Sequence, residues 1–63
     1  MSVKRFLEVF ANKDITVNII DKASDELVET VTANDKCIMN DYKTVKAWAI
    51  YEENYTTSIE VYV

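Results

Sequence analysis

The last third of the chain decides the fold, because two runs of strand-forming residues lie there on either side of a polar loop. The first run is VKAWAIY at residues 45–51, and the second is SIEVYV at residues 58–63. In both runs the side chains alternate with the period of two that a β-strand requires, and β-branched and aromatic residues are frequent. Asn54 in the loop 52–57 tolerates the positive φ of a tight turn. We therefore expect a closing β-hairpin.

Two more strands are expected earlier in the chain. Residues 15–21, ITVNIID, form one alternating run, and residues 27–33, LVETVTA, are rich enough in Val and Thr to favour a second. A helix that begins at a capping Ser24 is the alternative for the second run. The polar residues 22–25 are typical of a turn. The segment Asn34–Tyr42, which contains Cys37, is expected to be an irregular loop or one helical turn.

An amphipathic helix is predicted for residues 2–11, SVKRFLEVFA. Four apolar residues recur in it at the spacing i, i+3, i+4 and i+7, namely Val3, Phe6, Leu7 and Phe10. This spacing places them on one side of a helix. Ser2 stands where an N-cap residue is expected. A helix of about ten residues is marginal on its own in water, so we expect it to pack against the strands.

Together these elements predict a single α+β domain over residues 1–63. The expected order is helix, strand, strand, short turn or helix, strand, strand. The helix would pack on one face of an antiparallel sheet of about four strands, and the other face would be open to water. A domain of this size buries only about 60% of the surface that its unfolded chain exposes. A deep substrate pocket would take the place of apolar packing that a domain of this size needs for its stability.

The composition excludes most catalytic machinery. The 63 residues include no histidine, no glycine, no proline and one cysteine. The commonest general base, the glycine-rich phosphate loops and a four-ligand zinc site are therefore missing. The carboxylates at positions 21, 25, 26 and 29 lack the spacing and the glycine of a calcium loop. We predict a protein that is not an enzyme and that needs neither a cofactor nor a metal.

The cysteine count and the hydropathy of the sequence indicate the compartment in which the protein is found. A single cysteine cannot form an internal disulfide, and a buried structural thiol is the favoured interpretation of Cys37 over a reactive one. The first residues lack the pattern of a signal peptide, and no run of about 18 apolar residues is present to cross a membrane. The sequence thus predicts a cytoplasmic protein without a membrane partner.

The run 45–51 is apolar on both of its faces. Trp48 and Ile50 share one face, and a large aromatic residue favours packing of that face against the helix. Four residues would then form a flat outer patch with little charge: Ala47, Ala49, Tyr51 and Tyr62. With the opposite parity, Trp48 and Ile50 would lie outside beside Tyr62 and Ile20. Scattered apolar residues on an ordinary surface are the plain alternative to a contact patch.

The net charge of −4 is unevenly distributed. Residues 14–41 hold seven carboxylates against two lysines. Four of these carboxylates cluster around the turn predicted at residues 22–25: Asp21, Asp25, Glu26 and Glu29. Such a stretch opposes direct binding to nucleic acid. It suits a protein partner with a basic surface, such as a nucleic-acid-binding protein, although a solvated face that maintains solubility is the alternative.

The order of short motifs resembles a known group. VKxFLE at residues 3–8, VNIID at residues 17–21, Tyr42 ahead of Val45 and a closing hairpin are together similar to small proteins of bacteriophages and mobile elements in Gram-positive bacteria. The likeness extends over nearly the whole chain. It implies an accessory factor, and some proteins of this kind block host defence systems.

The function predicted from the sequence is that of a small non-enzymatic protein-binding module. It would dock on a host protein, as an accessory factor or an inhibitor, through the acidic cluster or the apolar outer patch. The alternative is a self-associating structural or assembly protein, a homodimer formed through the outer sheet face or through the edge of the strand 58–63. The second route requires that this strand lies at the edge of the sheet and not at its centre.

Overall fold

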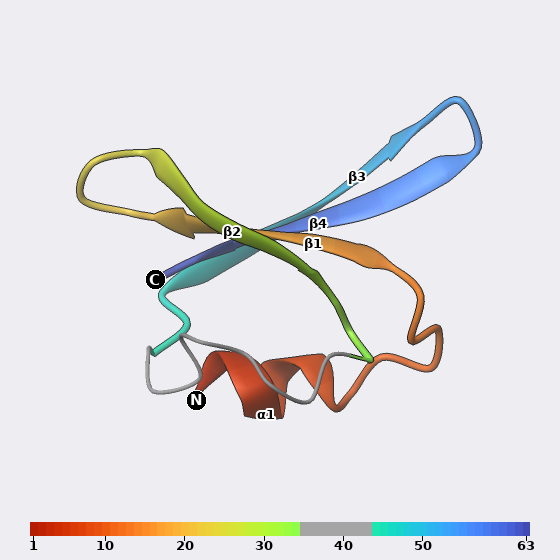
Figure 1. Ribbon diagram of the computed structural model, residues 1–63, viewed down its shortest axis with the longest axis horizontal. Helices are drawn as coiled ribbons and strands as arrows, with labels where there is room; N and C mark the ends of the chain where they lie inside the picture. Colours follow the sequence, from red (N-terminus) through yellow and green to blue (C-terminus); the bar gives the residue numbers. More distant parts are fainter. Residues whose placement is uncertain (35–43) are drawn as a thin grey trace.

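A computed structural model describes residues 1–34 and 44–63 and shows a small α+β fold (Figure 1). These ranges contain one helix and four strands: α1 (Val3–Leu7), β1 (Thr16–Asp21), β2 (Glu26–Thr32), β3 (Ala47–Glu53) and β4 (Thr56–Tyr62). The strands form one sheet, and α1 lies on one side of it (Figure 1). We call the side toward α1 the inner face and the opposite side the outer face. The expectations for Asn34–Tyr42 and for Cys37 fall on residues 35–43, outside the described residues.

The sheet is mixed, whereas an antiparallel sheet was predicted. Its strand order is β2-β1-β4-β3. Each hairpin is antiparallel, but the two central strands, β1 and β4, run parallel. β2 therefore ends at one end of the sheet, and β3 begins at the other after 14 intervening residues. A connection of this length permits either direction for the next strand, and alternation within each strand does not reveal which direction is used.

The core lies where the two parallel strands meet α1. On the inner face Val17 pairs with Ile59, and Ile19 pairs with Val61. All four side chains are fully buried, and Leu7 of α1 belongs to the same cluster. Burial of each such side chain contributes about 1.5–3 kcal/mol. The two hairpins thus join through their most apolar stripes.

The last strand is central, so the prediction of a homodimer contact through the edge of residues 58–63 is wrong. β4 pairs with β1 on one side and with β3 on the other. The edges of the sheet are β2 and β3. The physical reason is the inner stripe of β4: Ile59 and Val61 are removed from water completely only when strands flank them on both sides.

The helix is shorter than predicted. Ser2 caps α1, because its Oγ accepts a hydrogen bond of 3.2 Å from the Arg5 amide. After Leu7 the backbone continues in tighter turns, in which the amides of residues 8, 9 and 10 donate to carbonyls three residues earlier. The Lys13 ammonium donates to the carbonyl oxygens of Leu7 and Glu8 at 3.4 and 3.0 Å. A cation at this position satisfies the last carbonyls of the helix.

The loop predicted for residues 52–57 is reduced to a two-residue turn. β3 continues to Glu53 and β4 begins at Thr56, with these two residues paired. Asn54 and Tyr55 form the turn with φ values of 52° and 65°. Positive φ at both central positions is the type I′ pattern, whose twist matches that of a β-hairpin. Asparagine therefore supplies one of the two left-handed positions that glycine often fills.

Candidate interaction surface

The outer face of the sheet holds the predicted apolar patch. Paired residues in neighbouring strands share a face, and Ile50 and Trp48 pair with the buried Ile59 and Val61. The alternate residues of β3 therefore belong to the outer face, where Tyr62 pairs with Ala47. The four predicted patch residues, Ala47, Ala49, Tyr51 and Tyr62, are thus brought together. α1 is on the other side of the sheet (Figure 1).

The patch continues farther than the sequence indicated. Register pairs join one residue from each strand into a row that crosses the outer face: Leu27, Ile20, Tyr62 and Ala47. Ile20 in this row is buried, whereas Leu27 at the β2 edge is 61% exposed. Sequence reasoning missed Leu27, because a β-bulge on β2 shifts the pairing between Ile19 and Ile20 and turns Leu27 to the outer face. No local signal in the sequence marks that bulge.

Two pairs of polar side chains on the outer face are hydrogen-bonded to each other. The Thr30 hydroxyl donates to the Asn18 side-chain oxygen at 2.9 Å, and the Tyr62 hydroxyl donates to the Glu60 carboxylate at 2.8 Å. The bond to Glu60 is the largest cause that raises the pKa of Tyr62 to about 12, followed by partial burial and by the charge of Glu60. Tyr62 therefore stays neutral at physiological pH and presents a flat ring beside a carboxylate.

The inner side of β3 is apolar but poorly covered. Trp48 and Ile50 face the helix side of the sheet, as the favoured parity predicted, yet they remain 53% and 54% exposed. Phe6 of α1 reaches Trp48, with ring centroids 5.7 Å apart. A helix of five residues spans only about 7–8 Å. It covers the central strands β1 and β4 and leaves the inner side of β3 partly exposed. The face of Val45–Tyr51 that points inward is thus not fully buried.

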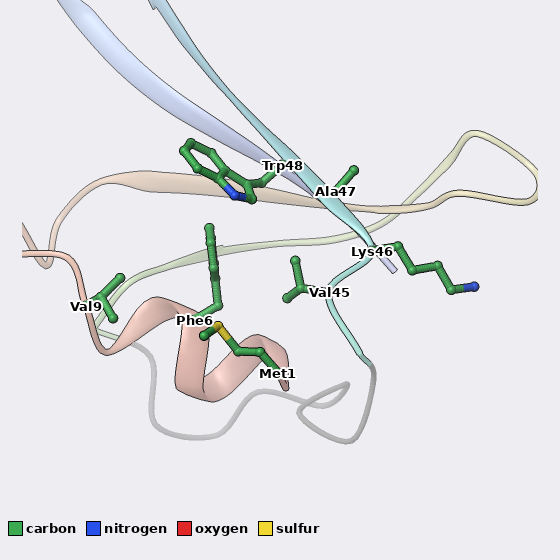
Figure 2. Close-up of a pocket in the computed structure, with 7 residues that line it drawn as sticks. All are labelled: Met1, Phe6, Val9, Val45, Lys46, Ala47 and Trp48. Atoms are coloured by element: carbon green, nitrogen blue, oxygen red, sulfur yellow. The ribbon is translucent and has the colours of Figure 1, made fainter.

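An open hollow of about 420 Å³ lies beside Trp48, between α1 and the start of β3 (Figure 2). Its lining is almost wholly apolar: Met1, Phe6, Val9, Val45, Lys46, Ala47 and Trp48. Lys46 is the one charged residue among them, and Figure 2 shows its ammonium directed away from Phe6 and Trp48. The hollow offers apolar contact area and presents no pair of groups for acid–base chemistry.

The predicted acidic residues lie on the β1–β2 hairpin, where the pair Asp21–Glu26 follows the pair Ile20–Leu27 of the apolar row. Asp21 and Glu26 are paired at the ends of β1 and β2, and Asp25 lies in the turn between them with a φ of 60°. Glu29 pairs with the buried Ile19 and so belongs to the inner face of β2. β2 and β3 are opposite edges of the sheet.

The acidic candidates and the apolar candidates thus belong mainly to different hairpins of the sheet. The carboxyl group of Asp25 alone influences the patch, as a minor cause of the raised Tyr62 pKa. The physical reason is the strand order. The acidic residues belong to the β1–β2 hairpin, and this order places β2 at the edge of the sheet opposite β3.

The charged strand residues of the outer face are acidic. Among the strand residues that the structure places on this face, only Glu53 and Glu60 are charged, and both are acidic. In the described ranges, no cluster of three or more acidic, cysteine or histidine residues has a geometry that could hold a metal ion. The one helix found in these ranges lacks the length and the apolar character needed to cross a membrane.

Comparison of the chain with protein-family models, with curated proteins and with solved structures finds no match.

Proposed function

We propose that this chain is a small non-enzymatic protein-binding module that docks through its outer sheet face on a partner with a basic surface. One observation carries the proposal: the outer face combines an apolar row across all four strands with carboxylates as its only charged strand residues in the described ranges. Contact surfaces between proteins favour aromatic and apolar residues at the centre and complementary charge at the rim.

The distribution of groups on this face supports a macromolecular partner. Tyr51 is 51% exposed at one edge and Leu27 is exposed at the other, so the apolar area extends over the width of the sheet. Glu60 is half-buried between them, where its charge is less screened than on an open surface. A nucleic-acid-binding host protein has the basic surface that fits, and the chain would act on it as an accessory factor or an inhibitor by covering that surface.

Site-specific crosslinking tests the proposal. A tagged chain that carries a photoreactive benzoylphenylalanine at Leu27 is irradiated in a bacterial lysate treated with nuclease, and the products are identified by mass spectrometry. The matched control carries the same group at Tyr55, which is fully exposed in the β3–β4 turn. We expect one basic protein to be captured at Leu27 and not at Tyr55. Equal capture at both positions would contradict docking through the outer face.

The purified partner then permits a quantitative test of charge. Glu53→Gln together with Glu60→Gln should weaken binding by about tenfold, which corresponds to about 1.4 kcal/mol, and added salt should weaken it further. Glu8→Gln is the control, since Glu8 is exposed on the helix side. An affinity that is unchanged by the double substitution and by salt would exclude the charged face as the contact.

If the Leu27 crosslink captures only another copy of the chain, the competing function, self-association through the outer face, replaces this proposal.

A further inference from the structure

Glu60 of β4 is a half-buried carboxylate with one oxygen engaged and one open. Its Oε1 accepts a hydrogen bond of 2.8 Å from the Tyr62 hydroxyl. Among residues 1–34 and 44–63, no other group donates to this carboxylate, and no lysine or arginine pairs with it. Partial burial weakens the hydration of a charged group, so a charge-assisted hydrogen bond at Oε2 would stabilise the carboxylate. The open oxygen is therefore an acceptor for a further cation.

The side chains next to Glu60 are uncharged, and those toward β3 are short. The register places Ala49 beside Glu60 and Ala47 beside Tyr62. Both alanine side chains end at Cβ, whereas the Tyr62 side chain extends beyond them. On the β1 side the register neighbour of Glu60 is Asn18, which is also uncharged. The carboxylate thus adjoins an aromatic ring and a strip of small apolar side chains.

We propose that this position binds an arginine side chain of the partner. The inference rests on the proposed docking function, because it names the basic group through which the partner is held. The guanidinium donates to Oε2 of Glu60, and its plane lies against the Tyr62 ring. The aliphatic part of the arginine side chain passes over the two alanines. We call this set of four residues the arginine site: Ala47, Ala49, Glu60 and Tyr62.

The chemistry of the arginine site favours arginine over lysine. A guanidinium is planar, so it can donate to a carboxylate and stack on an aromatic ring at the same time. It is also more weakly hydrated than an ammonium, so it loses less hydration when it lies over apolar side chains. A lysine ammonium is compact and strongly hydrated and meets the carboxylate as a point charge. The ring beside Glu60 would therefore contribute less to the binding of lysine.

Glu53, the other acidic strand residue of the outer face, does not share the surroundings of Glu60. It is exposed beside the β3–β4 turn. Water therefore competes for both of its oxygens, and salt screens its charge. An ion pair in such a setting contributes little. Glu60 is thus the carboxylate of this face that can hold a cation at a defined position.

Two short peptides test the arginine site before the partner is known. They are Leu-Arg-Leu and Leu-Lys-Leu, each acetylated and amidated at its ends, and they differ only in the basic side chain. Each is titrated at low salt into the isotope-labelled full chain, and binding is followed by the shifts of the amide NMR signals. We expect the arginine peptide to bind about fivefold more tightly, because the guanidinium both pairs and stacks. Equal affinities, or shifts centred on the turn at Asp25, would overturn the inference.

Substitutions locate the contact. Glu60→Gln should weaken binding of the arginine peptide by about fivefold or more, whereas Glu52→Gln is the matched control. Glu52 is an exposed carboxylate of the same hairpin, and it lies on the inner face because it alternates with Glu53. Tyr62→Leu removes the ring and keeps the carboxylate, so it should bring the affinity for the arginine peptide down to that for the lysine peptide. Equal effects of Glu60→Gln and Glu52→Gln would also overturn the inference.

A further variant covers the case in which Tyr62→Leu does not fold. Ala49→Leu lies on an edge strand and leaves Glu60 and Tyr62 in place, but its longer side chain occupies the position of the arginine. It should weaken binding of the arginine peptide, and an unchanged affinity would contradict the proposed position. Circular dichroism of each variant verifies that the sheet is intact.

The outcomes separate this inference from the docking function. If the Leu27 crosslink captures a basic protein but the two peptides bind equally, the docking function stands and the arginine site is wrong. If the arginine peptide is preferred but no protein is captured at Leu27, the docking function is wrong and the arginine site stands.

Discussion

The hydroxyl of Tyr62 donates a hydrogen bond of 2.8 Å to the carboxylate of Glu60, two residues earlier on the outer face of β4. The bond joins the aromatic ring of Tyr62 to Glu60, one of the two acidic strand residues on this face. It leaves the Tyr62 ring on the outer face with its hydroxyl already hydrogen-bonded within β4.

The first prediction concerns the ionisation of Tyr62. Its pKa is raised to about 12, mainly because ionisation would break the bond to Glu60. The neutral form is the one stabilised by folding, so this contribution to stability is complete below the unfolded pKa of about 10 and is lost as pH rises toward 12. A titration of tyrosinate absorbance should show a step near 12 that Tyr62→Phe removes and that Glu60→Gln moves to lower pH. An unchanged titration curve in Tyr62→Phe would contradict the assignment.

The second prediction compares two isoleucines that face each other in the register. Ile59 is fully buried in β4, and Ile50 opposite it in β3 is 54% exposed. Ile59→Val should lower the free energy of unfolding by about 1 kcal/mol, because it removes a buried methylene group, whereas Ile50→Val should change it by only a few tenths. Urea denaturation at low protein concentration measures both. Equal losses would contradict the incomplete cover of the inner face at β3.

The third prediction concerns the β3–β4 turn. Tyr55 holds a φ of 65° and is fully exposed, and a residue with a Cβ atom is strained there by about 1–2 kcal/mol. Tyr55→Gly relieves this strain at some cost in chain entropy. We expect a net gain of about 0.5–1 kcal/mol, which raises Tm by roughly 2–8 °C in a domain of this size. Thr56→Gly, within β4, should lower Tm instead, and a drop in Tm for Tyr55→Gly would refute the turn geometry.

The fourth prediction concerns the cap of α1. The Ser2 hydroxyl accepts a bond from the Arg5 amide, so Ser2→Ala should cost about 1 kcal/mol of stability. Ser2→Asp should retain most of it, because an aspartate at this position also caps and favours the helix dipole. Urea denaturation distinguishes the two variants. If both lose the same amount, the hydroxyl does not cap the helix.

Much of the local structure was predictable from neighbouring residues. Alternation identified the four strands to within two residues at every end, and the spacing of Trp48 and Ile50 showed that they share a face, although it did not show which face. The favoured strand at residues 27–33 corresponds to β2 at Glu26–Thr32, and Asn54 adopts the positive φ expected of it. These features depend on backbone sterics and side-chain periodicity, which act over a few residues and are therefore visible in the sequence.

The candidate site was predictable only in part. The outer patch of Ala47, Ala49, Tyr51 and Tyr62 lies together because its members belong to one hairpin, whose register is set by the Asn54–Tyr55 turn. The acidic residues around Asp25 lie on the other hairpin, β1–β2. Their separation follows from the order of strands in the sheet, which no spacing within the sequence encodes. Leu27 was missed because the bulge on β2 reverses the face that simple alternation assigns to it.

By itself, the sequence determined the elements, the turn residues, the two-sided apolar character of β3 and the lack of histidine and glycine chemistry. Only the tertiary structure decided that β4 is central, that β1 and β4 run parallel and that β3 lies at one end of the strand order found in the described residues. The physical reason is the range of the interactions. Strand formation responds to adjacent residues, whereas strand order is selected by burial of Val17, Ile19, Ile59 and Val61 in one cluster, brought together from distant parts of the chain.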